Sequence, residues 1–163
     1  MIAVDASTLI LLAKTELLDL FLGSFPKKPF ISAEVEKEAT KKESFDALLI
    51  KERIKEKKIL VRKVKSKKMA EKIAKDFRLH SGEAETLALC IENNWKLVGT
   101  DDYNAIKACI VLQIKYVSAL SILIKLNKEK KLNKTEALLK LQNLVYFGRY
   151  SEEIISEVKN RLR

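Results

Sequence analysis

The feature that most constrains this fold is a regular alternation of short apolar runs with segments of helical periodicity. Five strand-length apolar runs occur, at residues 2–4, 30–31, 59–61, 96–99 and 114–117. Helical patterns separate them, and strands that alternate with helices form parallel sheets joined by right-handed crossovers. The sequence therefore predicts a three-layer α/β/α Rossmann-like sandwich, with a central, mainly parallel sheet of about four to five strands.

The last part of the chain has a different pattern. Everything after Ser118 is typical of helix, in segments of about 118–128, 134–147 and 151–162. A chain of 163 residues suits one domain with a sizeable core. We therefore predict a single domain over residues 1–163, with an α/β core at 1–117 and a helical C-terminal part at 118–163.

Charge is the first indication of a partner. The chain has 32 Lys and Arg against 22 Asp and Glu, a net charge of +10. Such a surface favours polyanions, with RNA or DNA ahead of acidic lipid. A composition rich in Lys and Glu is also found in heat-adapted proteins, so charge by itself leaves both interpretations open.

Other counts exclude whole classes of protein. Two cysteines without close spacing and a single histidine exclude zinc ribbons and disulfide scaffolds, and leave little for Ser-His-Asp or Cys-His catalysis. No apolar run reaches the roughly 18–20 residues that cross a bilayer. The first residues have no basic lead-in to an apolar stretch, so no secretory signal is expected and the protein is predicted to be cytoplasmic.

Acidic residues gather where the predicted strands end. Asp5 follows the first strand directly, and Asp101 and Asp102 follow the fourth. In parallel sheets the carboxyl ends of the strands share one rim, where ligands bind. Glu38 and Glu83 lie in helices that flank this rim. Carboxylates gathered there would repel one another unless a cation neutralised them, which predicts Mg²⁺ or Mn²⁺ and hence phosphodiester cleavage by activated water.

Each acid also has a structural interpretation. An Asp directly after a strand can cap the helix that follows, and an acid in the first turn of a helix interacts favourably with the helix dipole. Glu83 shares its helix face with Leu87 and Cys90, which is an unusual setting for a solvated acid. Glu85 lies on a more polar face and is predicted to be structural or to support the site from behind.

Four sequence motifs resemble those of the PIN-domain nuclease family. They are IAVDAS at 2–7, Val-x-x-Glu at 35–38, GEAETLA at 82–88 and LVGTDD at 97–102. Each is short, but together they occur in the family's order and cover residues 2 to about 117. The resemblance implies a Rossmann-like fold and a metal-dependent endoribonuclease.

The resemblance also implies particular roles. The catalytic and metal-binding acids would be Asp5, Glu38, Glu83 and either Asp101 or Asp102, with one or two Mg²⁺ or Mn²⁺ ions. Glu34, one helical turn before Glu38, is the alternative second acid. Ser7 and Thr100 would support these ligands by hydrogen bonding.

Two branches of the family match in part. Stand-alone domains of this size resemble VapC-type toxins of toxin–antitoxin pairs, which implies an RNA substrate, a homodimer and a small antitoxin protein. The stretch from Thr100 to Tyr103 resembles the branch that processes ribosomal RNA. That branch usually carries a zinc ribbon, which two cysteines cannot form.

A basic run supplies a candidate RNA-binding surface, formed by Arg62, Lys63, Lys65, Lys67 and Lys68. A solvated helix face is an equally good interpretation of these residues. Tyr103, beside the acids, is a candidate for stacking on a base. The alternative functions are a catalytically silent RNA- or ribosome-binding module of the same fold and a nuclease acting on DNA.

Overall fold

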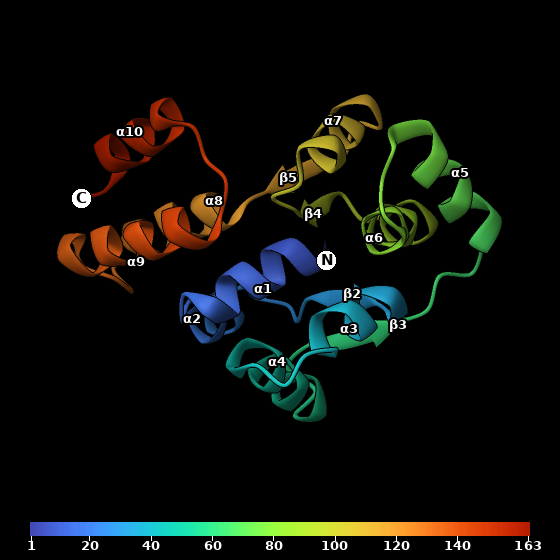
Figure 1. Ribbon diagram of the computed structural model, residues 1–163, viewed down its shortest axis with the longest axis horizontal. Coiled ribbons are helices and arrows are strands. Elements are labelled where there is room, and N and C mark those ends of the chain that lie inside the picture. The colour runs from blue at the N-terminus through green and yellow to red at the C-terminus, as the bar shows by residue number, and fades with distance from the viewer.

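A computed structural model describes residues 1–163 and contains one five-stranded sheet (Figure 1). The strands are β1 (Ile2–Val4), β2 (Phe30–Ser32), β3 (Leu60–Arg62), β4 (Leu97–Gly99) and β5 (Lys115–Val117). Their order is β3-β2-β1-β4-β5, and every pairing is parallel. The predicted α/β fold with a central parallel sheet is confirmed, and β1 lies at its middle.

Ten helices surround the sheet. The first six are α1 (Ala6–Lys14), α2 (Leu18–Ser24), α3 (Ala33–Thr40), α4 (Phe45–Lys55), α5 (Lys67–Phe77) and α6 (Ser81–Glu92). The last four are α7 (Tyr103–Val111), α8 (Ala119–Lys128), α9 (Lys134–Phe147) and α10 (Glu152–Arg161). None of them is both long and apolar enough to cross a bilayer.

Two hydrophobic cores lie on opposite faces of the sheet because successive strand residues point to opposite sides. Ile2 and Val4 of β1 belong to the larger core, which they share with α1 to α4 and α8 to α10. Ala3, between them, belongs to the smaller core under α5, α6 and α7. This alternation produces the three layers that the sequence pattern predicts.

The helices after β5 belong to the larger core. Leu123 of α8, Leu141 and Leu144 of α9 and Val158 of α10 are all buried in it. In Figure 1, α9 and α10 lie side by side at the end of the molecule opposite α5.

Local backbone geometry sets where two of the helices begin. Helix α2 begins only at Leu18, because Glu16 has a positive φ of 57° that separates it from α1. The basic stretch after β3 contains α5, which Ser66 caps by accepting a hydrogen bond from the Met69 amide.

Candidate active site

Four helices start at the carboxyl rim of the sheet. Asp5, Ser32, Asp102 and Ser118 cap α1, α3, α7 and α8, each by accepting a hydrogen bond from a backbone amide in the first turn. Helix N-termini carry partial positive charge and exposed N–H groups, so this rim favours anions. Two of the four caps are themselves predicted site residues, Asp5 and Asp102.

Asp5 is held rigidly at the middle of the rim. Its Oδ1 accepts hydrogen bonds from Ser7 Oγ at 2.8 Å and from the Thr8 amide at 3.0 Å. Its Oδ2 accepts from Thr100 Oγ1 at 2.5 Å. Ser7 and Thr100, predicted to support the ligands by hydrogen bonding, therefore both contact this carboxylate. A carboxylate has about four acceptor positions, so these three bonds leave about one for a further partner.

Burial makes the charge of Asp5 costly. The residue is 1% exposed, and loss of hydration raises its pKa to about 7 despite the three hydrogen bonds that favour the ionised form. The neighbouring charge of Asp101 adds to the increase in pKa. A bound cation is a partner that would favour the ionised form here.

A second group of acids lies beside the first. Glu83 is half-buried at the start of α6, and its Oε2 accepts a hydrogen bond from the His80 amide at 3.0 Å. Burial raises the pKa of Glu83, and the nearby charges of Asp102 and Glu38 raise it further. Asp102 and Glu38 thus both lie close enough to Glu83 for their charges to act on it.

Thr100 connects the two groups. Its hydroxyl donates to Asp5 and accepts a hydrogen bond from the Asp102 amide at 3.2 Å. Asp102 in turn uses Oδ2 to accept from the Ala105 amide at 2.9 Å, which caps α7. One buried threonine therefore sets the position of both acids that follow β1 and β4.

Gly82 makes room for Glu38. A Cβ atom at position 82 would lie 2.9 Å from Glu38 Oε2 and 3.4 Å from Val35 Cγ2. Real Cβ atoms do not approach an oxygen that closely, so the carboxylate of Glu38 occupies space that a side chain at position 82 would fill. The motif at 82–88 thus contributes to the site in two ways: it supplies Glu83, and its glycine leaves room for the Glu38 carboxylate.

Asp101 has a different role from Asp102. Its Oδ2 accepts from Thr8 Oγ1 at 2.6 Å and from the Ala119 amide at 3.0 Å, and its Oδ1 accepts from Tyr150 Oη at 2.8 Å. Burial raises its pKa. These contacts join the rim to the start of α8 and to the segment between α9 and α10. Of the two adjacent acids, it is Asp102 whose charge acts on Glu83.

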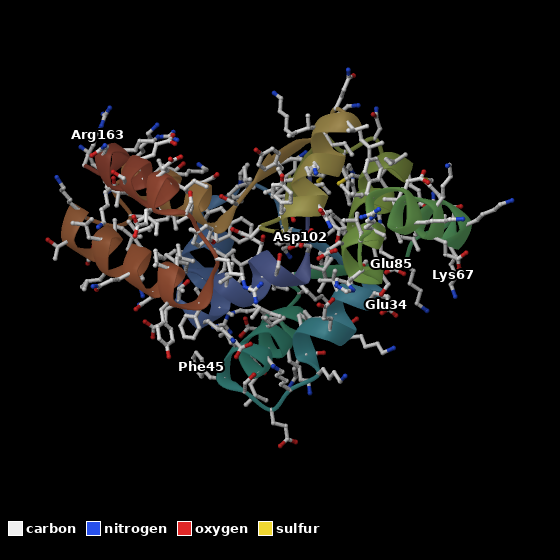
Figure 2. All side chains as sticks on the ribbon, turned by 45° about the horizontal axis from the view of Figure 1, so that its top comes forward. Glu34, Phe45, Lys67, Glu85, Asp102 and Arg163 are labelled. Atoms are coloured by element: carbon white, nitrogen blue, oxygen red, sulfur yellow. The ribbon has the colours of Figure 1, made fainter.

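Glu34 and Glu85 form a separate contact between α3 and α6. The Glu34 amide donates to Glu85 Oε2 at 3.2 Å, and Ser81 Oγ donates to Glu34 Oε2 at 3.4 Å. Figure 2 shows both residues beside one another, with Lys67 beyond them. Glu85 therefore makes the structural contact that its polar helix face indicates.

The basic run lies at the β3 edge of the sheet. Arg62 packs its guanidinium over the rings of Phe30 and Trp95, at 4.9 and 5.4 Å, and donates to Asn93 Oδ1. The Lys65 amide bonds the carboxylate of Glu92. Lys63, Lys67 and Lys68 are exposed to solvent. Arg62 is thus held by packing, while the RNA-binding role of the lysines remains a prediction.

The donor chemistry suits a hard divalent cation. No group of three or more Asp, Glu, His or Cys side chains is arranged closely enough to hold a metal ion. The acids lie instead as two neighbouring groups, Asp5 with Asp101 and Glu83 with Asp102 and Glu38. Mg²⁺ keeps several waters and is bound through one or two carboxylates, so buried Asp5 in one group and the pair Glu83 and Asp102 in the other fit such an ion.

A family model described as a PIN domain, DUF3368, matches residues 1–163. The chain belongs to the PIN-domain family. PIN domains are generally nucleases and typically use divalent metal ions. The comparison with curated proteins gave no match, and the comparison with solved structures gave none either.

Two residues at the rim of this PIN domain could not be predicted from the sequence. Thr8 and Tyr150 hold Asp101 from positions 93 and 49 residues away in the chain. Neither belongs to a motif, and an isolated Thr or Tyr carries no local signal of its partner. For Thr8 the only available hint is its place in the first turn after Asp5.

Proposed function

We propose that this PIN domain is an endoribonuclease that depends on one or two Mg²⁺ or Mn²⁺ ions. Asp5 would hold an ion in the first group of acids, Glu83 and Asp102 would hold one in the second, and Glu38 lies beside them. The observation that carries the proposal is the burial of Asp5, a carboxylate with a raised pKa at the N-terminus of α1. If Asp5 served only to cap α1, a neutral capping residue would do so without the free-energy cost of burying a carboxylate.

The chain's own residues prepare the site. Ser7, Thr8 and Thr100 fix the Asp5 carboxylate in one orientation. A divalent ion, when bound, supplies a water of lowered pKa and neutralises charge on the phosphodiester. The N-termini of α1 and α7 offer partial positive charge to a phosphate at the same rim. Glu38 is exposed beside Gly82, and we expect its carboxylate to orient the attacking water or to accept a proton from it.

The test is cleavage of labelled single-stranded RNA with Mn²⁺ or with EDTA. Asp5→Asn, Glu83→Gln and Asp102→Asn should each lower the cleavage rate at least about 100-fold. Mutation of a residue that only hydrogen-bonds to a metal ligand already lowers activity about 10- to 100-fold. Glu43→Gln, an exposed acid without an ion pair, is the matched control and should cut like the parent. Cutting unaffected by Asp5→Asn would overturn the proposal.

The same assay addresses the other functions. RNA binding without metal-dependent cutting would indicate a silent binding module, and cutting of DNA but not RNA would indicate a DNA nuclease. Asp101→Asn separates the two adjacent acids: it should lower stability while retaining more activity than Asp102→Asn, since Asp101 contacts Thr8, Ala119 and Tyr150.

We also propose that the protein is a toxin that forms a homodimer and is bound by a small antitoxin protein. Exposed apolar side chains on α9 and α10 offer a surface for a protein partner: Leu139, Tyr146, Phe147 and Ile154. Induced expression should arrest bacterial growth, and Asp5→Asn should relieve the arrest. Growth that continues with the parent protein would contradict the toxin role and leave the nuclease proposal to its own assay.

A further inference from the structure

A groove of about 410 Å³ opens beside the acids, between the α/β core and the C-terminal helices. Tyr103 and Tyr116 line it from the core, and Arg149, Tyr150 and Arg161 line it from the segment after α9. We call these five residues the tyrosine groove. Asp101 also lines it, so the groove adjoins the rim directly. Its volume lies within the range of about 300–1,000 Å³ that is typical of small-molecule sites.

Two of the three tyrosines of the groove are exposed to solvent. Tyr103 directly follows Asp102 and is 71% exposed, and Tyr116 is 42% exposed. The hydroxyl of Tyr150 is bound to Asp101, which fixes that ring at the boundary between groove and rim. Lys107 Nζ lies 4.9 Å from the Tyr103 ring centroid, which adds positive charge beside it. Exposed rings next to positive charge are the surfaces on which unpaired bases stack.

The arginines of the groove have no partner within the protein. Neither Arg149 nor Arg161 takes part in any of the chain's ion pairs. Both are exposed, and α10 contributes one acid, Glu157, to the same groove. Asp101, the other acid there, already accepts hydrogen bonds from Thr8, Ala119 and Tyr150. Two free guanidinium groups are thus available for phosphates.

We propose that the tyrosine groove binds an unpaired nucleotide of single-stranded RNA that flanks the phosphate at the acidic rim. Its base stacks on Tyr103, and Arg149 and Arg161 contact the backbone phosphates. A base inside a duplex cannot reach a tyrosine ring, so the substrate class is single-stranded. The inference rests on the proposed function for the position of the cut, and it makes the C-terminal helices one wall of the substrate site.

Binding separates this inference from catalysis. Fluorescence anisotropy with a short, unstructured, labelled RNA in EDTA measures affinity where no metal-dependent cutting occurs. Tyr103→Ala should weaken binding about 10-fold or more, the usual effect of losing one stacked base. Phe45→Ala removes an exposed aromatic ring outside the groove; it is the matched control and should bind like the parent.

The arginines are tested through salt dependence. Each phosphate contact that is lost should lower the slope of log affinity against log salt by about 0.7 for a single strand. Arg149→Ala/Arg161→Ala should therefore reduce the slope by about twice that amount. Lys128→Ala/Arg163→Ala removes the same charge from a separate hollow near the C-terminus and controls for net charge. Circular dichroism of every variant checks that it is folded.

The outcomes distinguish the two proposals. Loss of binding in the groove variants, with normal binding in both controls, supports the tyrosine groove even if the parent never cuts RNA. Parent-like binding in the groove variants overturns it, even if the parent is an active nuclease. Equal weakening by the groove and control arginine pairs would reduce the effect to net charge and also overturns it. Tighter binding of duplex RNA than of single-stranded RNA would also overturn the proposal, because the groove is assigned to an unpaired nucleotide.

Discussion

At the scale of single residues, the central feature is a carboxylate placed where its charge is unfavourable. Asp5 is buried, and only three donors offset the loss of hydration: two on α1 and Thr100 directly after β4. Burial raises its pKa to about 7 from an ordinary 3.8. Folding therefore favours the protonated form of Asp5, and a bound cation would favour the ionised form.

This burial predicts an unusual dependence of stability on pH. Between about pH 4 and 7 the folded protein keeps a proton on Asp5 that the unfolded chain has lost, so stability falls as pH rises and levels off above 7. Asp5→Asn should remove that loss. Its stability relative to the parent should therefore increase from pH 5 to pH 8, by on the order of 4 kcal/mol at most. Urea denaturation at both pH values measures the difference.

A divalent ion should act in the opposite direction. Mg²⁺ or Mn²⁺ at pH 8 should stabilise the parent by mass action and leave Asp5→Asn unchanged. Parallel pH profiles for the two proteins would mean that Asp5 ionises with an ordinary pKa. Equal stabilisation of both by the metal would place the ion elsewhere.

Gly82 allows structure and activity to be separated. Gly82→Ala places a Cβ atom 2.9 Å from Glu38 Oε2, so the flexible carboxylate must move. Stability should stay level or rise by up to about 1 kcal/mol, since alanine is the better helix former. RNA cleavage should fall about 10-fold or more if Glu38 acts at the site. Thermal denaturation and the cleavage assay measure the two effects, and unchanged cleavage would exclude a role for Glu38.

At the scale of elements, the rim depends on contacts between helices that are distant in sequence. Asp101 joins α1, the start of α8 and the segment between α9 and α10. Because helix N-termini gather there, the same backbone amides that cap the helices also favour anions. Structural capping and substrate attraction therefore arise from one arrangement.

Removing one bond of Asp101 should loosen the C-terminal helices. Tyr150→Phe leaves Asp101 with its bonds to Thr8 and Ala119 but takes away the Tyr150 hydroxyl. We expect a loss of about 1.5–3 kcal/mol in the free energy of unfolding, the usual range for a hydrogen bond to a charged group. Hydrogen exchange should rise in α10 before it rises in the sheet.

Tyr146→Phe is the control for this experiment, because Tyr146 is 82% exposed and its hydroxyl makes no hydrogen bond within the protein. Equal effects of the two substitutions would show that the bond to Asp101 contributes nothing measurable.

At the scale of the whole molecule, one large core unites the α/β part and the C-terminal helices. Twelve of its 26 buried residues come from position 119 onward. The full chain should therefore unfold in a single cooperative transition. A chain ending at residue 117 should not fold by itself, since each buried leucine lost costs about 2–5 kcal/mol against a total stability of about 5–15.

Calorimetry and circular dichroism of both chains test this cooperativity. A folded, cooperative fragment 1–117 would show that the C-terminal helices are a separable addition. Two transitions in the full chain would lead to the same conclusion.

What the sequence determined by itself is local in origin. The period of the apolar residues set the five strands and most of the helices, and the rule that parallel strands end at one rim placed Asp5, Asp101 and Asp102 together. The capping of α1 and α7 by Asp5 and Asp102 also follows from neighbours three residues away.

The tertiary structure alone decided which acid serves which purpose. Asp101 and Asp102 are adjacent and chemically identical, yet one contacts Tyr150 while the other lies near Glu83. The tyrosine groove likewise forms only where Arg149, Tyr150 and Arg161 face Tyr103 and Tyr116 across one pocket. The reason is physical: hydrogen bonds and burial depend on distance in space, and no local periodicity encodes a contact across 49 or 93 residues.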